Sequence, residues 1–186
     1  MQIFTDENTK IENNLVLPVL AVRGLVFFPG MILQFDVARK KSVLAVSEAI
    51  SSDRLIFLVT QIDLSDKEPT GDDLYKIGVI ARIKQVVHHS EEGVKLHVEG
   101  VCRGEINSLL QEEPYLLGDI TKCPVLTYKP SYRSEALLRI IHEKFDDYLR
   151  LFKHVPPDVL LGVLQEKDCG RLADYITSNI SIDFER

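Results

Sequence analysis

The sequence has no tryptophan and only three cysteines, which stand far apart at Cys102, Cys123 and Cys169. There is no Cys-x-x-Cys pair and no nearby histidine at the spacing of a zinc ligand, so the pattern predicts no metal site. So few cysteines in a chain of 186 residues also argue against a disulfide framework. We expect free, partly buried thiols in a reducing compartment.

Long apolar runs and targeting signals are missing too. The longest apolar stretches, such as 15–22 and 55–59, are too short to cross a bilayer, and the N-terminus lacks the basic-then-apolar pattern of a signal peptide. These absences predict a cytoplasmic protein with no membrane partner. The net charge is −6, from 22 basic and 28 acidic residues, and neither half of the chain has the basic excess of a nucleic-acid-binding surface.

Catalytic motifs are absent as well. The chain has no phosphate loop of the Walker type, no Gly-x-Ser-x-Gly elbow and no His-Glu-x-x-His helix. The acidic stretch 61–73 lacks the ligand spacing of an EF-hand loop. A cysteine nucleophile at Cys102 would have His97 roughly 17 Å away along an extended strand, which leaves open only a cross-strand approach by His88. We therefore predict a non-catalytic chain with no cofactor and no metal of its own.

What the sequence does contain, from residue 15 to residue 128, is a series of β-strand signals. Apolar residues that alternate or run together predict short strands at 15–22, 31–37, 55–59, 77–83, 94–98, 102–106 and 114–120. The run 55–59 is apolar throughout, as in a strand covered on both faces. Residues 39–51 carry apolar side chains at helical spacing and predict one inserted helix. Short strands with regular turns and one helix are typical of a partly closed β-barrel.

Residues 129–186 change to a helical periodicity. A long helix is predicted from the apolar stripe Leu137, Ile141, Phe145, Tyr148 and Phe152, and a second helix from Val159, Leu160, Val163 and Leu164. Asp168 is placed to cap a third helix. Asp183 resembles the cap of a fourth helix, which suggests a piece cut from a longer protein. The predicted organisation is a flexible leader (1–14), a β subdomain (15–128) and a helical subdomain (129–186).

One turn is unusually apolar. Leu25, Val26, Phe27 and Phe28 precede the turn signal Pro29-Gly30, and Met31 follows it. Turns are usually polar because their backbone groups must meet water. Either these side chains offer an apolar surface to a partner, or Val26 and Phe28 alternate into the core. We take Leu25, Val26, Phe27, Phe28 and Met31 as the candidate substrate-binding residues.

These segments have the order and spacing of one known family. They closely resemble the N-terminal domain of the bacterial Lon proteases. The segments that carry the resemblance are Leu17–Met31, Arg39–Ser42, Asp73–Ile83, Val98–Arg103 and Leu172–Ile176. The resemblance implies an α+β fold: a PUA-like, six-stranded β pseudo-barrel with one inserted helix, followed by a C-terminal helical bundle. It also implies that ATP and Mg²⁺ are used by an ATPase module, and a Ser-Lys dyad by a protease module, that both lie outside these residues.

The resemblance implies a function as well. In that family the N-terminal domain helps to recognise unfolded or damaged proteins and helps to organise a homohexamer. An exposed apolar turn suits this task, because unfolded chains differ from folded ones mainly in their uncovered hydrophobic residues. The alternatives are a stand-alone PUA-like module that binds RNA or a protein ligand, and a small cysteine hydrolase.

Overall fold

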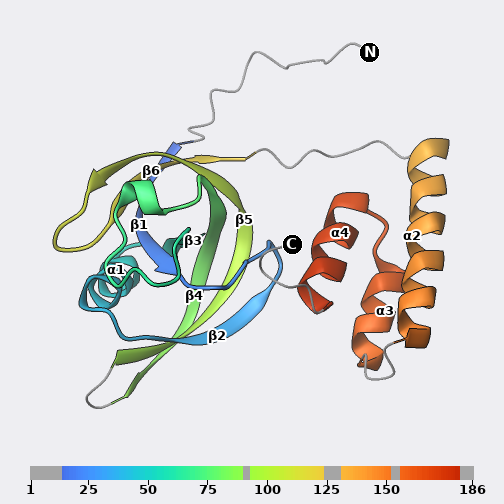
Figure 1. The fold of residues 1–186 in the computed structure, drawn as a ribbon, viewed down its shortest axis with the longest axis horizontal. Coiled ribbons are helices and arrows are strands. Elements are labelled where there is room, and N and C mark those ends of the chain that lie inside the picture. The colour runs from blue at the N-terminus through green and yellow to red at the C-terminus, as the bar shows by residue number, and fades with distance from the viewer. Residues whose placement is uncertain (1–13, 90–92, 124–130, 152–155, 181–186) are drawn as a thin grey trace, which may run out of the picture.

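The computed structural model describes residues 14–89, 93–123, 131–151 and 156–180. Six strands form one mixed sheet (Figure 1): β1 (Asn14–Val22), β2 (Ile32–Val37), β3 (Leu55–Thr60), β4 (Ile77–His89), β5 (Gly93–Gln111) and β6 (Leu117–Lys122). The predicted leader, apart from Asn14, and the predicted cap Asp183 lie outside the described residues.

The strand pairing bends the sheet into a ring. The order is β2-β5-β4-β3-β1-β6, and β5 also pairs with β6, which closes β5, β4, β3, β1 and β6 on one another. The pairings are antiparallel, except that β1 and β3 run parallel. A closed ring leaves fewer unpaired strand edges. The prediction of a mixed fold with a partly closed sheet is confirmed.

The division of the segment 94–106 was predicted wrongly. Instead of two short strands, β5 is one strand of 19 residues that pairs with β2, β4 and β6 in turn. Its glycines do not interrupt it but allow close crossing, since a Cβ on Gly104 would stand 2.8 Å from Ile120 Cγ2. The register with β4 shifts at Ile80/Ala81, where Val101 is the extra residue of a bulge.

Strand β3 is covered on both faces, as its continuous apolar run predicts. Ile56 and Leu58 belong to one apolar cluster, and Phe57 and Val59 to another, with at most 1 % of each residue exposed. The predicted helix is α1 (Lys40–Ser51), which packs Val46 and Ala49 into the first cluster.

Three further helices share a separate apolar cluster: α2 (Tyr132–Leu151), α3 (Pro157–Gln165) and α4 (Cys169–Asn179). Asp168 caps α4 by accepting a hydrogen bond from the backbone N–H of Arg171 (2.9 Å), as predicted. None of the described helices combines the length and apolar character needed to cross a bilayer.

Two residues of the predicted helix stripes point to solvent instead. Leu137 is 46 % exposed and Leu164 is 55 % exposed. In α2 it is Leu138, three residues before Ile141, that packs on the cluster. The sequence analysis expected Leu137, four residues before Ile141. Phe152 lies outside the described residues.

Candidate functional site

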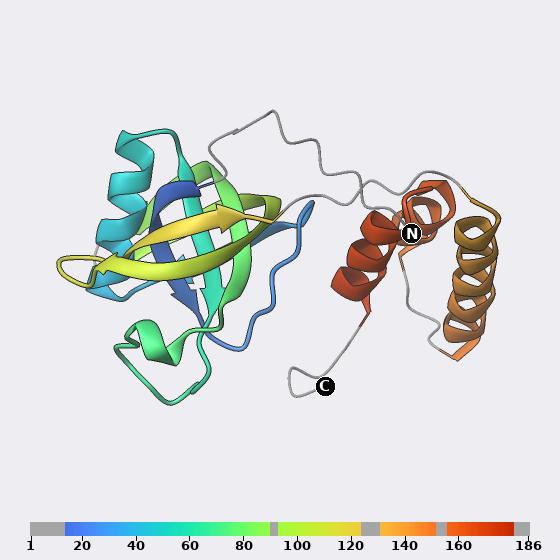
Figure 2. The ribbon, with the colours of Figure 1, turned by 90° about the horizontal axis from the view of Figure 1, so that it is seen from above.

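The apolar turn, defined as residues 25–31, joins β1 to β2 and extends along the side of the sheet that faces α4 (Figure 2). Its side chains divide into two sets. Phe27 is 7 % exposed and belongs to the apolar cluster with α1, whereas Val26 is 46 % exposed. Phe28, Leu25 and Met31 are partly buried. The alternative in which Val26 and Phe28 both enter the core is therefore wrong for Val26, which is exposed. Phe28 is only partly buried.

The turn is fixed to β5 through one glycine. The backbone N–H of Gly30 donates to the carbonyl of Gly100 (2.9 Å), and the N–H of Gly100 donates to the carbonyl of Met31 (2.9 Å). A Cβ on Gly100 would stand 2.4 Å from the Phe28 carbonyl oxygen and 3.1 Å from the ring of Phe27. Position 100 therefore needs a residue without a side chain for the turn to lie against the strand.

The reversal itself follows from Pro29-Gly30. Gly30 has φ +82°, and the N–H of Met31 donates to the carbonyl of Phe28 (3.2 Å), a pattern typical of a type II turn with proline and glycine at its centre. The hydroxyl of Thr60 donates to the carbonyl of Leu25 (2.7 Å). Because these backbone groups of the turn have partners within the protein, they do not need water, and apolar side chains are tolerated beside them.

Phe28 connects the turn to the helices. The guanidinium carbon of Arg103 on β5 lies 5.8 Å from the centre of the Phe28 ring, and Arg103 donates two hydrogen bonds to Asp174 on α4, at 2.8 and 2.6 Å. The Asp174 carboxylate raises the pKa of the Arg103 guanidinium above its ordinary value through these bonds. A bidentate ion pair of this kind fixes the relative orientation of the two side chains as well as their distance.

We expect the Arg103–Asp174 pair to contribute about 1 kcal/mol of coupling free energy, because it is bidentate but Arg103 is partly exposed to water. The measurement is a double-mutant cycle in urea with Arg103→Gln, Asp174→Asn and the double variant. Additive effects, within roughly 0.3 kcal/mol, would show that the pair does not couple the sheet to α4.

Two hollows flank the apolar turn. One, of about 540 Å³, is lined by Val26, Thr60, Tyr75, Lys76 and Ile77, and its three largest apolar members are 44–51 % exposed. The other, of about 670 Å³, lies between the turn and α4, with Pro29, Met31, Ile32, Val101, Asp174 and Tyr175 among its lining. Because exposed apolar side chains gather around these hollows, this surface is the candidate contact site.

Several of these residues were missed by the sequence analysis. Ile77 and Val101 stand in strands, where alternation predicts burial of one face but not which end of the strand is uncovered. Tyr175 is far from the turn in sequence, and only the folded structure places it in the lining of the second hollow. Tyr75 precedes β4 and belongs to no apolar period, so the sequence offers no pattern that would have found this hollow.

In the part of the chain that the structure describes, no three His, Cys, Asp or Glu side chains are placed to hold a metal ion. Burial raises the pKa of the Cys102 thiol, an effect that Lys122 partly opposes. A nucleophilic cysteine needs a lowered pKa, since the thiolate is the reactive form. The cysteine hydrolase interpretation therefore has no support at Cys102.

Comparison with known proteins identifies the chain as the substrate-binding type of domain found in an ATP-dependent protease. The family described as "ATP-dependent protease La (LON) substrate-binding domain" matches residues 16–186. The chain belongs to this Lon substrate-binding domain family.

Individual Lon proteases resemble the chain in sequence, and a solved structure resembles it in fold. The chain is 36 % identical over 169 residues to the Lon protease of Desulforamulus reducens (91 % of this chain, 21 % of the relative). It is 37 % identical over 175 residues to that of Clostridium acetobutylicum (94 % and 22 %). The N-terminal domain of Mycobacterium avium complex Lon protease has a similar fold, with a TM-score of 0.69, 21 % identity, and coverage of 90 % of this chain and 83 % of that one. The chain thus spans about a fifth of the length of these two Lon proteases.

Proposed function

We propose that this domain binds unfolded or damaged polypeptides through the apolar turn, with Val26 and Phe28 as the main contacts and Leu25 and Met31 at their edges. The observation that carries the proposal is a hollow beside the apolar turn, around which Val26, Tyr75 and Ile77 are exposed. The backbone of the turn itself is fixed to β5. Phe27 contributes indirectly: its ring is buried in the core and holds the turn in place.

The expected affinity is low and tolerant of sequence. Full burial of one large apolar side chain contributes about 1.5–3 kcal/mol, and the contacts here are partial, so two or three of them give weak binding. Weak contacts suit a domain that must accept many sequences and release them again. A folded protein, whose apolar side chains are mostly inside, offers few partners to such a surface.

In the full protein we propose that this domain is joined to an ATPase module and a serine endopeptidase module with a Ser-Lys dyad, within a homohexamer. Membership of the Lon family supports this. We assign the contribution to assembly to the outer faces of α2 and α3, where Ile140, Leu151 and Leu161 are 52, 79 and 56 % exposed. We also class the ring of strands as PUA-like and the three C-terminal helices as a bundle.

The alternative function, RNA binding by a PUA-like module, is disfavoured by charge. Of the basic residues on the β4–β5 hairpin, Lys84 pairs with Glu99, and Lys95 lies 3.8 Å from Asp36. Cations that are already paired with carboxylates contribute little to phosphate binding. The net charge of −6 acts in the same direction.

The test is a titration of the chain with a labelled, permanently unfolded protein. We expect Val26→Ser and Phe28→Ser each to weaken binding about 5- to 30-fold, which corresponds to roughly 1–2 kcal/mol of lost apolar contact. The matched control is Leu110→Ser, since Leu110 is 55 % exposed and stands ten residues beyond Gly100 on the extended strand β5. Equal losses in all three variants, or no binding by the parent chain, would contradict the proposal.

A further inference from the structure

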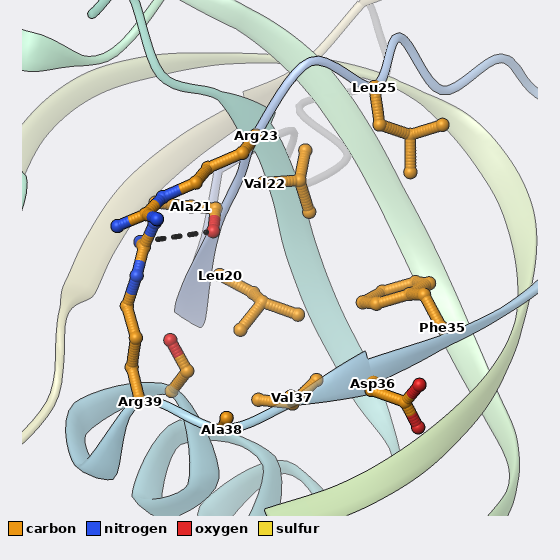
Figure 3. Close-up of a pocket in the computed structure, with 11 residues that line it drawn as sticks. Leu20, Ala21, Val22, Arg23, Leu25, Phe35, Asp36, Val37, Ala38 and Arg39 are labelled. Atoms are coloured by element: carbon orange, nitrogen blue, oxygen red, sulfur yellow. Dashed lines mark hydrogen bonds between the residues drawn. The ribbon is translucent and has the colours of Figure 1, made fainter. Parts of the chain in front are cut away.

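A pocket of about 320 Å³ opens where the end of β1, the end of β2 and the start of α1 meet (Figure 3). Its floor is apolar and includes Leu20, Val22 and Val37, each 7 % exposed or less. Leu25 and Phe35 continue this apolar part. Because Leu25 also begins the apolar turn, the pocket adjoins the proposed binding surface.

Two arginines lie side by side along one wall of the pocket (Figure 3). Arg39 donates to the side-chain oxygen of Gln61 (2.6 Å) and, at 3.5 Å, to the carbonyl of Ala21. Arg23 donates to the backbone carbonyl of Asp66 (2.7 Å). All of these acceptors are neutral, and within the described ranges neither arginine forms an ion pair with a carboxylate.

The two neighbouring positive charges on this wall are electrostatically unfavourable. Burial lowers the pKa of the Arg39 guanidinium, and the charge of Arg23 lowers it further, while Asp66 and Glu68 oppose the effect. Arginine nevertheless stays charged at neutral pH, so two positive charges repel one another here. Each guanidinium has five N–H donors, and the protein acceptors named above use only part of them.

The start of α1 adds to the positive charge. Arg39, Lys40 and Lys41 are consecutive at the N-terminus of this helix of 12 residues, whose first turn holds no acid. Helices favour acids there, because the dipole is positive at that end. Lys41 is paired with Glu113 at 2.6 Å, but no described carboxylate pairs with Lys40. Basic residues in place of acids at a helix N-terminus go against this preference, and such departures are expected at functional sites.

We propose that this arginine pocket receives the carboxylate end of a substrate polypeptide, with the last side chain on the apolar floor and the terminal carboxylate held by Arg23 and Arg39. The planar guanidinium matches a carboxylate with two parallel hydrogen bonds. A volume of about 320 Å³ is at the small end of ligand sites and suits one terminal residue. Asp36, at the rim, lies toward Lys95 and does not occupy the arginines.

This inference deepens the proposed function and rests on it, because the apolar turn would hold the residues that precede the chain end. It adds a preference that the turn alone does not provide. Two unfolded chains of equal composition would differ in affinity according to whether their last residue is apolar and its carboxylate free.

The probe is a fluorescein-labelled peptide of 12 residues that ends in leucine, made with a free carboxylate and as the amide. With the full 186-residue chain we expect the amide to bind at least about 10-fold more weakly, as for the loss of a charge-assisted pair. The difference should shrink as salt is raised. Equal affinities, or no measurable binding of either peptide, would overturn the inference.

Arg23→Gln is the decisive variant, because Arg23 is exposed and Arg39 also holds the buried Gln61. We expect Arg23→Gln to remove the preference for the free carboxylate, and Arg133→Gln, which deletes one exposed positive charge on α2, to retain it. A preference that survives Arg23→Gln would overturn the inference. Binding of the permanently unfolded protein, and its loss in Phe28→Ser, test the proposed function independently of the peptide result.

Discussion

Replacement of Phe27 by alanine is expected to lower the free energy of unfolding by roughly 3–5 kcal/mol, the usual cost of deleting a buried phenylalanine ring. Phe27 is 7 % exposed and packs in the cluster that α1 shares with β3 and β4. Its ring also lies against Gly100, where a Cβ would be 3.1 Å away. The loss should appear as a lower urea midpoint with little change in the slope.

The control is the neighbouring residue. Phe28→Ala should cost only about 1 kcal/mol, because the ring is partly exposed and its identified partner is the Arg103 guanidinium at 5.8 Å. Phe28→Ala should nevertheless weaken binding of the unfolded protein, whereas the Phe27 variant should lose stability first. Equal destabilisation by the two substitutions would contradict the division of the turn into an anchor and a contact residue.

The second large effect is expected from a single methyl group at position 100. Gly100→Ala would place its Cβ 2.4 Å from the Phe28 carbonyl oxygen, a backbone atom that cannot rotate away. The turn must therefore lift from β5, at the expense of the hydrogen bonds from Gly30 and to Met31. We expect a loss of roughly 2–4 kcal/mol in urea, from two weakened backbone bonds and looser packing of Phe27.

Binding should fall with stability in Gly100→Ala, because the same movement displaces Val26 and Phe28. Gly170→Ala is the matched control: its Cβ would meet only the side-chain oxygen of Asp168, at 3.2 Å, and alanine favours a helix. That variant should stay within about 1 kcal/mol of the parent, since only the Asp168 side chain has to shift. A Gly100→Ala chain with parental stability and parental binding would show that the turn is not seated on β5 as described.

Regular elements were predictable because their periodicity is local. The run Leu55–Val59 indicated a strand buried on both faces, and its side chains divide between two clusters. The turn was harder, since residues 25–28 are not in a strand and a period of two does not apply there. Phe27, the phenylalanine that enters the core, lies against Gly100, which is more than 70 residues away in sequence.

The helices show the same limit. Leu137 and Leu138 both fit an apolar stripe in α2, and only packing against the other helices selects Leu138. Arg103 and Asp174 are 71 residues apart and belong to different parts of the chain, so no spacing rule pairs them. The hollow at Tyr75 and Ile77, like the arginine pocket, is formed by segments that meet only in the fold.

The most direct measurement is photo-cross-linking with benzoylphenylalanine placed singly at position 26, 28 or 132. The target is one protein offered in its folded form and in a permanently unfolded form. We predict cross-links from positions 26 and 28 to the unfolded form alone, and few from position 132, although Tyr132 is 94 % exposed. Cross-links from position 132 that equal those from the turn, or equal labelling of the folded form, would contradict the account.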